Sequence, residues 1–293
     1  MIKKNLIRIL LILLILFISY FFSIAGASNG IQIGGIPAFT LMFALIFTIQ
    51  YLMFLVSFYL KTDTFFDITG SITYIILMIS SYIIGGIGDL RSLILMSIIV
   101  LWAVRLGTFL FTRVHRSGGD KRFIEIKKSF FSFMLTWSLQ GIWVLICTGV
   151  ALTVILSETK TEMGLIGMFG LLCWIVGFYL EVIADYQKYI FRKDQSNQDK
   201  FITTGLWAWS RHPNYFGEIL LWFGVTIIAF PALQGLQLIT IISPIFVTLL
   251  LTKISGINLL EKSNYEKWGD DEEFLNYMEN TPRLIIRPPK KRN

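Results

Sequence analysis

The stretch SRHPNYFGEILLWFGVTIIAF, residues 210–230, joins a polar run directly to an apolar run that is long enough to enter a lipid bilayer. Proline is favoured at the first position of a helix, so we expect Pro213 to begin a helix, with His212 as the residue before it. On that helix Asn214 and Glu218 are four residues apart and share one face. The stretch therefore predicts a membrane-spanning helix with polar side chains gathered at its mouth.

The rest of the chain has the composition of an integral membrane protein. Of its 293 residues 55% are hydrophobic, and its mean hydropathy is +0.66, whereas a soluble domain is about 45–50% apolar. This composition predicts an all-α, polytopic transmembrane helical bundle of about 7–8 spans. Apolar runs of suitable length fall at 6–25, 38–60, 68–88, 92–112, 131–156, 163–184, 216–233 and 236–254. The short break at 231–237 is compatible with either a tight hairpin or a kink.

Basic residues concentrate in alternate loops and at both ends of the chain. Because Lys and Arg favour cytoplasmic loops, this pattern predicts that both termini are cytoplasmic, in a bacterial inner membrane or an endoplasmic reticulum membrane. It also accounts for the net charge of +7 without a nucleic-acid partner. The first apolar run exceeds the about 7–15 residues of a signal peptide, so we interpret it as a retained span, with cleavage as the alternative. The expected organisation is an anchor at 1–30, a membrane domain at 31–285 and a basic tail at 286–293, with linker-like sequence after Asn276.

Several kinds of site are disfavoured by the sequence. Cys147 and Cys173 lie inside apolar runs, where neither a disulfide framework nor a zinc site is expected. The two histidines, His115 and His212, are too few for a histidine-rich di-iron site. The glycine cluster at 85–89 lacks the strand, the helix and the spacing of a Rossmann site. We therefore expect neither a metal centre nor a Rossmann domain.

The segment GFYLEVIADYQKYIFRK, residues 177–193, carries charged side chains at helical spacing. Glu181, Asp185, Lys188 and Arg192 form one polar stripe on the predicted helix. Charged groups at membrane depth are costly and normally face a cavity or a partner. Self-pairing of charges where the helix leaves the bilayer explains Lys188 and Arg192 equally well, but the deeper Glu181 and Asp185 favour a cavity.

Other polar positions extend this cavity. Arg211 and His212 lie at the positive end of a helix dipole, a position suited to phosphate or carboxylate, although a snorkelling arginine is the simpler alternative for Arg211. Arg105 is an arginine within an apolar run and needs an acidic or phosphate partner. Asp120 and Arg122 lie in a charged loop that is explained equally by solvation. On the predicted topology these groups share the cytoplasmic side, where one cavity would suit a large charged cofactor.

Six segments together resemble the steroid 5-alpha-reductase-like superfamily, especially its DUF1295 branch. They occur in order over about residues 60–285 and are LWAVRLG (101–107), DKRF (120–123), LQG (139–141), EVIADYQ (181–187), GLWAWSRHPNYFGE (205–218) and SGINLLE (255–261). Their joint occurrence is specific, whereas an Arg-His-Pro-x-Tyr run alone recurs in membrane methyltransferases.

The resemblance implies NADPH-dependent reduction of an activated carbon–carbon double bond in a lipid-like substrate, which would be steroid-like, polyprenoid or acyl. It also implies that a helical bundle holds the cofactor at the cytosolic side. By resemblance the cofactor cavity is lined by Arg122, Asp185, Arg211, His212, Asn214, Tyr215 and Glu218, and the polar positions Arg105, Asp120 and Glu181 are expected to join them. Glu181 stands where the steroid-reducing branch has an asparagine, a difference that bears on the substrate.

The implied reaction is hydride transfer from the nicotinamide to the β carbon of an enone. A tyrosine or an acid would donate a hydrogen bond to the carbonyl as it becomes an enolate. In the N-terminal half the candidates for such catalytic residues are Gln50, Asp67 and Tyr74. Tyr51 and Tyr59 compete with Tyr74, since tyrosine is common at membrane interfaces.

Other functions remain open from the sequence. An S-adenosylmethionine-dependent lipid methyltransferase would also use the Arg-His-Pro run and an acid, but the number of spans and the series from Arg105 to Glu261 favour the reductase. A non-catalytic membrane protein with a vestigial cavity is a third possibility. A proton-coupled transporter would carry buried acids as well, although repeats or broken helices are more typical of it.

Overall fold

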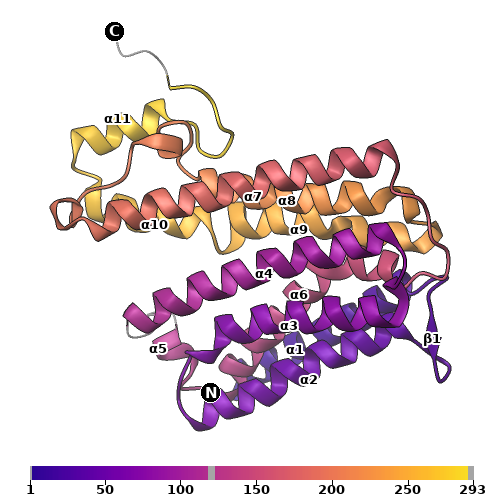
Figure 1. Ribbon diagram of the computed structural model, residues 1–293. Helices are drawn as coiled ribbons and strands as arrows, with labels where there is room; N and C mark the ends of the chain where they lie inside the picture. Colours follow the sequence, from indigo (N-terminus) through magenta and orange to yellow (C-terminus); the bar gives the residue numbers. More distant parts are fainter. Residues whose placement is uncertain (1, 118–122, 290–293) are drawn as a thin grey trace. The chain divides into compact units, whose positions relative to one another are not determined.

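The computed structural model describes residues 2–117 and 123–289, and its regular structure is almost entirely α-helical (Figure 1). Within this part of the chain eight helical segments are long and apolar enough to cross a membrane. They correspond to all or most of α1 Ile2–Gly26, α2 Ala38–Tyr59, α3 Phe65–Ser81, α4 Leu90–Ser117, α6 Phe130–Ile155, α7 Gly164–Lys193, α8 Pro213–Ala229 and α9 Ile242–Leu249. The prediction of an all-α polytopic bundle is confirmed, and the chain is a multi-pass membrane protein.

Short elements connect and follow the spans. Strands β1 Gln32–Ile33 and β2 Ile36–Pro37 pair antiparallel between α1 and α2. Their turn is Gly34-Gly35, with φ of +59° and +79°, and a two-residue hairpin of this kind needs positive φ at both positions. The remaining helices are α5 Phe123–Ile126, α10 Ile257–Trp268 and α11 Glu272–Asn280. Asp271 caps α11, because its carboxylate accepts hydrogen bonds from the backbone of Glu273 (2.8 Å) and Phe274 (3.2 Å).

The chain forms two compact units. Unit 1 contains Met1–Gly167 and Ile228–Ser243, and unit 2 contains Met168–Ile227 and Pro244–Asn293. Residue 30, the expected end of an N-terminal anchor, therefore lies inside unit 1. There α1 packs closely on α6, since a Cβ added at Gly149 would meet the Phe22 ring at 2.5 Å. The first helix is thus an integral part of unit 1.

Helix α6 lies at the centre of unit 1 and contacts α1, α2, α3 and α4. It is apolar on every side, and its residues 144–155 are all buried, as expected for a helix surrounded by other helices. Close approaches use small residues: Gly141 faces the ring of Phe47 on α2, and Gly107 on α4 faces Ser71 on α3. These contacts place the polar residues of α2, α3 and α4 within one packed bundle.

Two cations of unit 1, Arg91 near the start of α4 and Lys160 in the connection after α6, donate hydrogen bonds to backbone carbonyl groups. The buried Arg91 guanidinium donates to the carbonyl oxygens of Ile228 and Glu162. Lys160 donates through Nζ to the carbonyl oxygen of Ile155 at 2.7 Å, at the C-terminal end of α6. Cations are favourable at this end of a helix, because its last carbonyl groups have no partner within the helix. Arg91 and Lys160 therefore have a structural role.

In unit 2 the helices α7 and α8 run antiparallel with their backbones in direct contact. A Cβ at Gly177 would lie 2.6 Å from the Gly217 carbonyl oxygen, and one at Gly217 would lie 2.6 Å from the Glu181 backbone nitrogen. Further along, a Cβ at Gly224 would lie 2.6 Å from the Trp174 backbone nitrogen. Such close packing through small residues is typical of membrane helices. It fixes the polar residues of α7 beside those at the start of α8.

The last two apolar runs form a hairpin. Helix α8 ends at Ala229, and a 3₁₀ segment, Gly235–Ile241, leads into α9 after the non-helical Leu233 and Gln234. On α10, which follows α9, Glu261 lies 3.2 Å from His212, the residue before α8. Since the chain returns to the start of α8, it must reverse direction between α8 and α9. The alternative of one kinked helix is excluded.

Candidate functional site

The polar residues predicted at the start of the helix in residues 210–230 are found together in unit 2. Helix α8 begins at Pro213, as expected, and His212 immediately before it is buried. The backbone N–H of His212 donates to Ser210 Oγ at 3.1 Å, so the chain is held in place as it enters the helix. Tyr215 stacks on the His212 ring with centroids 5.8 Å apart and planes 9° apart. The start of α8 is therefore an ordered polar surface.

A single carboxylate gathers three basic side chains at this surface. Glu261 on α10 forms an ion pair with Arg211 Nη1 at 3.0 Å, lies 3.2 Å from His212 Nε2, and accepts a hydrogen bond from Arg283 Nε at 3.1 Å. We call these four residues the Glu261 cluster. The Arg211 and Glu261 side chains are each 15% exposed, so the ion pair is largely shielded from solvent and is stronger than a surface pair.

The C-terminal segment is bound to the loop that precedes α8. The backbone N–H of Arg211 donates to the Pro282 carbonyl oxygen at 2.9 Å, and Ser210 Oγ donates to that of Leu284 at 2.9 Å. The backbone N–H of Arg287 in turn donates to the Trp209 carbonyl oxygen at 3.0 Å. The expectation of linker-like sequence after Asn276 is wrong up to Arg287, because α11 continues to Asn280 and the following residues are hydrogen-bonded.

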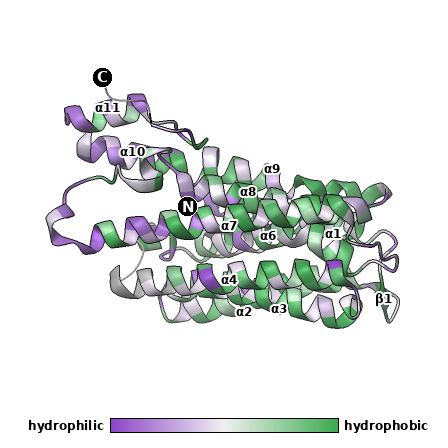
Figure 2. Ribbon diagram, turned by 45° about the horizontal axis from the view of Figure 1, so that its top comes forward, coloured by the Kyte–Doolittle hydropathy of each residue, from purple (hydrophilic) through white to green (hydrophobic). Residues whose placement is uncertain are grey.

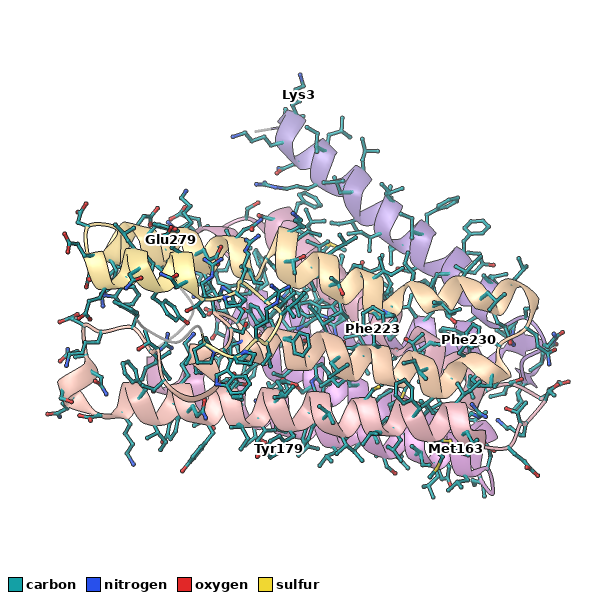
Figure 3. All side chains as sticks on the ribbon, turned by 90° about the horizontal axis from the view of Figure 1, so that it is seen from above. Lys3, Met163, Tyr179, Phe223, Phe230 and Glu279 are labelled. Carbon is teal, nitrogen blue, oxygen red and sulfur yellow. The ribbon has the colours of Figure 1, made fainter. Side chains whose placement is uncertain are left out.

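Helix α7 contributes the acidic side of the site. Asn214 Nδ2 donates to Asp185 Oδ1 at 3.1 Å, and Glu181, one turn earlier on α7, is buried. Tyr179 is 63% exposed and lies on the side of α7 that faces away from α8 (Figure 3). Glu218 is half-buried one turn after Asn214. The stripe predicted on this helix therefore turns its acids toward α8.

Some buried polar atoms at the site lack hydrogen-bond partners among residues 2–117 and 123–289. They include Arg211 Nε, a donor, and Asn214 Oδ1, an acceptor. Buried polar groups are normally satisfied, so each such atom needs an explanation, and a bound ligand is one. Arg211 precedes α8 and Asn214 lies in its first turn, where backbone N–H groups also have no partner within the helix. The site can therefore receive a ligand with both anionic and hydrogen-bonding groups.

Burial controls the protonation of the groups around the Glu261 cluster. Desolvation lowers the pKa of His212 below its usual value, and the nearby Glu261 carboxylate offsets this only in part. Burial also raises the pKa of Tyr277, whose hydroxyl donates to the Trp207 carbonyl oxygen at 2.8 Å. At neutral pH His212 is therefore an uncharged imidazole, and Tyr277 is a protonated anchor for the loop.

Acidification is expected to destabilise the protein through His212. Its pKa is lower in the folded chain than the unfolded value of about 6.5, so the unfolded chain binds more protons as the pH falls below that value. The contribution is present above pH ~6.5 and is lost as the pH falls through the folded pKa. Thermal unfolding in detergent at pH 7.5 and 5.5 measures this, and His212→Gln should reduce the difference. An unchanged difference in the variant would assign the pH dependence to other groups.

The predicted catalytic residues lie in unit 1. Gln50 on α2 is fully buried and donates through Nε2 to Thr73 Oγ1 at 3.2 Å, while its Oε1 has no hydrogen-bond partner in the described part of the chain. Tyr74, the next residue on α3, is buried with its ring edge-on to Trp102 at 5.2 Å. Asp67 lies two turns before Tyr74 on the same helix and is half-buried. The structure therefore brings Gln50 and Tyr74 to neighbouring positions.

The competing tyrosines occupy different environments. Tyr51 shares a hydrogen bond of 3.0 Å with Ser138 on α6, and Tyr59 is 85% exposed at the end of α2. Tyr74 is thus the buried one of these three tyrosines.

Three of the predicted cofactor-binding residues lie on α4 or in the loop after it. Arg105 on α4 is half-buried, with its guanidinium carbon 5.6 Å from the centre of the Phe109 ring. Asp120 and Arg122 lie outside the described residues.

Sequence reasoning missed part of the site. Glu261 is present in the prediction only as the end of a matched segment, and Arg283 lies within the predicted membrane domain at 31–285 with no role assigned to it. The signal for Glu261 was its place on a helix that is too polar to span a membrane alone. The sequence carries no comparable signal for Arg283, because its partner is 22 residues away in the chain.

Comparisons with known proteins identify a family without a described reaction. A family model described as "Protein of unknown function (DUF1295)" matches residues 53–281. This range covers more than half of the chain and includes α7, α8 and Glu261, and it ends two residues before Arg283. A search of curated proteins found no match.

Proposed function

The chain belongs to the DUF1295 family, and we propose that it is an integral membrane reductase that uses NADPH to reduce an activated carbon–carbon double bond in a lipid-like substrate. Both termini would lie in the cytosol, which holds the cofactor. The Glu261 cluster and the acids of α7 would then form the cofactor site, and the lipid-like substrate would reach the protein from the bilayer.

The observation that supports this proposal is that the buried, unsatisfied atoms Arg211 Nε and Asn214 Oδ1 lie at the same site as the two arginines of the Glu261 cluster. Arg211 Nε can donate to a phosphate oxygen, and Asn214 Oδ1 can accept from an amide or a hydroxyl group. A dinucleotide carries both kinds of group, so the residues present fit NADPH. S-adenosylmethionine has no phosphate group and could offer the two arginines only its single carboxylate, so NADPH is the better match for two guanidinium groups.

Bound NADPH would supply a hydride ion, and the protein would position the reactants and stabilise charge. Arg211 and Arg283 would hold phosphate oxygens through charge-assisted hydrogen bonds, with Glu261 keeping the two guanidinium groups in place. Asn214 and Asp185 would hold ribose hydroxyls or the carboxamide. Tyr74 would donate a hydrogen bond to the substrate carbonyl and stabilise the developing enolate.

Ligand-dependent thermal unfolding of the full-length protein in detergent tests the proposal. We expect NADPH to raise Tm, because a ligand at 100 times its Kd stabilises a folded protein by about 2.7 kcal/mol. Stabilisation by S-adenosylmethionine alone would support the methyltransferase instead, and no response to either ligand would support a non-catalytic protein. Transfer of deuterium from labelled NADPH to a lipid of a membrane extract, detected by mass spectrometry, would establish the reaction.

Two variants should weaken NADPH binding. Arg211→Gln removes the guanidinium, and Glu218→Gln changes only charge on the same face of α8 as Asn214. We expect the Kd for NADPH to rise about tenfold or more for Arg211→Gln, since a hydrogen bond to a charged group contributes about 1.5–3 kcal/mol. The control is Lys262→Gln on α10, whose side chain is 76% exposed. Equal NADPH affinity in all three variants would mean that the cofactor site lies elsewhere.

A further inference from the structure

A second cationic site lies in unit 2, beyond the end of α7. A cavity of about 630 Å³ is lined there by residues of two segments, the end of α7 with the turn after it and the end of α10. Its lining includes Arg192, Lys193, Asp194, Lys200, Lys267 and Trp268. Four of these side chains are cationic and one is acidic, so the cavity favours a ligand with more than one negative charge.

The wall of this cavity is aromatic and fixed. Trp268 Nε1 donates to the Asp199 carbonyl oxygen at 2.8 Å, and its ring packs against Phe201 with centroids 5.7 Å apart. Lys267 Nζ lies 4.7 Å from the centre of the same indole ring. An ordered indole beside several cations is suited to a flat base that carries a phosphate group, because bases stack on aromatic rings and cations bind the phosphate.

Two helices connect the cavity to the site at the start of α8. On α7, Asp185 bonds to Asn214 and Arg192 lines the cavity. On α10, Glu261 bonds to His212 and Lys267 lines the cavity. Each interval of six or seven residues advances about 10 Å along its helix axis. A spacing of about 10 Å between the site at the start of α8 and the cavity suits one nucleoside that carries a phosphate group at each end.

The surface of the same region is hydrophilic. Figure 2 shows hydrophilic residues gathered over α10, α11 and the end of α7, while apolar residues cover most of α7 and α8. A charged ligand can therefore lie along the polar stripe of α7, which runs from Glu181 through Asp185 and Lys188 to Arg192. The acids of this stripe lie at its apolar end and the cations at its hydrophilic end.

We infer that this cavity binds the 2′-phosphoadenosine end of the dinucleotide, so that Arg192 and Lys267 make the protein select NADPH over NADH. The inference rests on the proposed function and adds a determinant of cofactor specificity to it. The 2′-phosphate is the group that distinguishes the two dinucleotides, and the cavity places four cations where that group would lie. The nicotinamide end would then lie toward Asn214 and Asp185.

Binding of NADPH and NADH to the full-length protein in detergent tests the inference. For the double variant R192Q/K267Q we expect NADPH affinity to fall about 100-fold or more and NADH affinity to stay the same, because each charge-assisted hydrogen bond contributes about tenfold or more. Adenosine 2′,5′-bisphosphate should compete with NADPH in the parent and much less in the double variant. The control is again Lys262→Gln, which removes an exposed cation of α10 outside the cavity lining.

The outcomes separate this inference from the proposed function. A parent protein that binds neither dinucleotide contradicts both. A parent that binds NADPH, together with a double variant that keeps its preference over NADH or weakens both equally, contradicts only the assignment of this cavity. Misfolding is not expected to confuse the result, because the Lys267–Asp199 pair is exposed and such pairs contribute about 0–1 kcal/mol to stability. The Tm of each variant without ligand checks this point.

Discussion

Replacing Gly217 with alanine is expected to lower the Tm of the protein by about 2–12 °C. The added Cβ would lie 2.6 Å from the Glu181 backbone nitrogen and 2.6 Å from the Gly177 carbonyl oxygen. Neither atom belongs to a flexible side chain, so α7 and α8 must separate. Overpacking of this kind costs about 1–3 kcal/mol, and 1 kcal/mol corresponds to about 2–4 °C in a protein of 150–250 residues.

The separation of α7 from α8 should also disturb the candidate cofactor site. Asn214 and Asp185 are joined across the two helices at 3.1 Å, one turn from Gly217, and a shift of a few tenths of an ångström would lengthen this bond. We therefore expect Gly217→Ala to weaken the binding of NADPH as well as the fold. Fluorescence-detected unfolding in detergent, with and without ligand, measures both effects.

The matched control is Gly167→Ala, on α7 itself. There the added Cβ would meet the Met163 sulfur at 2.9 Å, at the far end of a flexible side chain that can move aside. Alanine is also about 0.8–1.0 kcal/mol better than glycine within a helix, so this variant should keep or raise Tm. A similar fall in Tm for both variants would show that the contact between α7 and α8 does not depend on Gly217.

The start of α8 was predictable because local signals determine it. Proline at a first helical position, polar residues before it and an apolar run after it specify the helix start and the face that Asn214 and Glu218 share. The number of spans was predictable for the same reason, since each apolar run is long enough by itself. The reversal between α8 and α9 was not, because a hairpin and a kink use the same turn residues.

The remaining parts of the site depend on contacts between distant residues. Gly177 and Gly217 carry a packing role that becomes visible only when the two helices are placed together. The same is true of Glu261, which meets Arg211 and Arg283 from positions far apart in the chain. Charge patterning identified basic residues in alternate loops but could not show which of them share one carboxylate. Residue type and spacing therefore predicted the polar residues at the start of α8 but not Glu261, the carboxylate that they share.

Replacing Glu261 with glutamine is expected to lower Tm by about 10 °C. The carboxylate is the common partner of Arg211, His212 and Arg283, and its side chain is only 15% exposed. Removing one partner of a buried ion pair costs about 3–5 kcal/mol, because the remaining charge is left uncompensated. Glutamine keeps the shape of the side chain, so the loss reports charge and hydrogen bonding rather than packing.

Glu266→Gln on the same helix is the matched control. Its carboxylate lies 4.0 Å from Lys262, and the two side chains are 67% and 76% exposed, so this pair should contribute about 0.3–0.5 kcal/mol. A double-mutant cycle of Glu261→Gln with Arg283→Gln should give a coupling energy of about 0.5–3 kcal/mol, since the two groups are in direct contact. If Glu266→Gln lowered Tm as much as Glu261→Gln, or if the cycle were additive, Glu261 would not be the residue that joins α10 and the C-terminal segment to the start of α8.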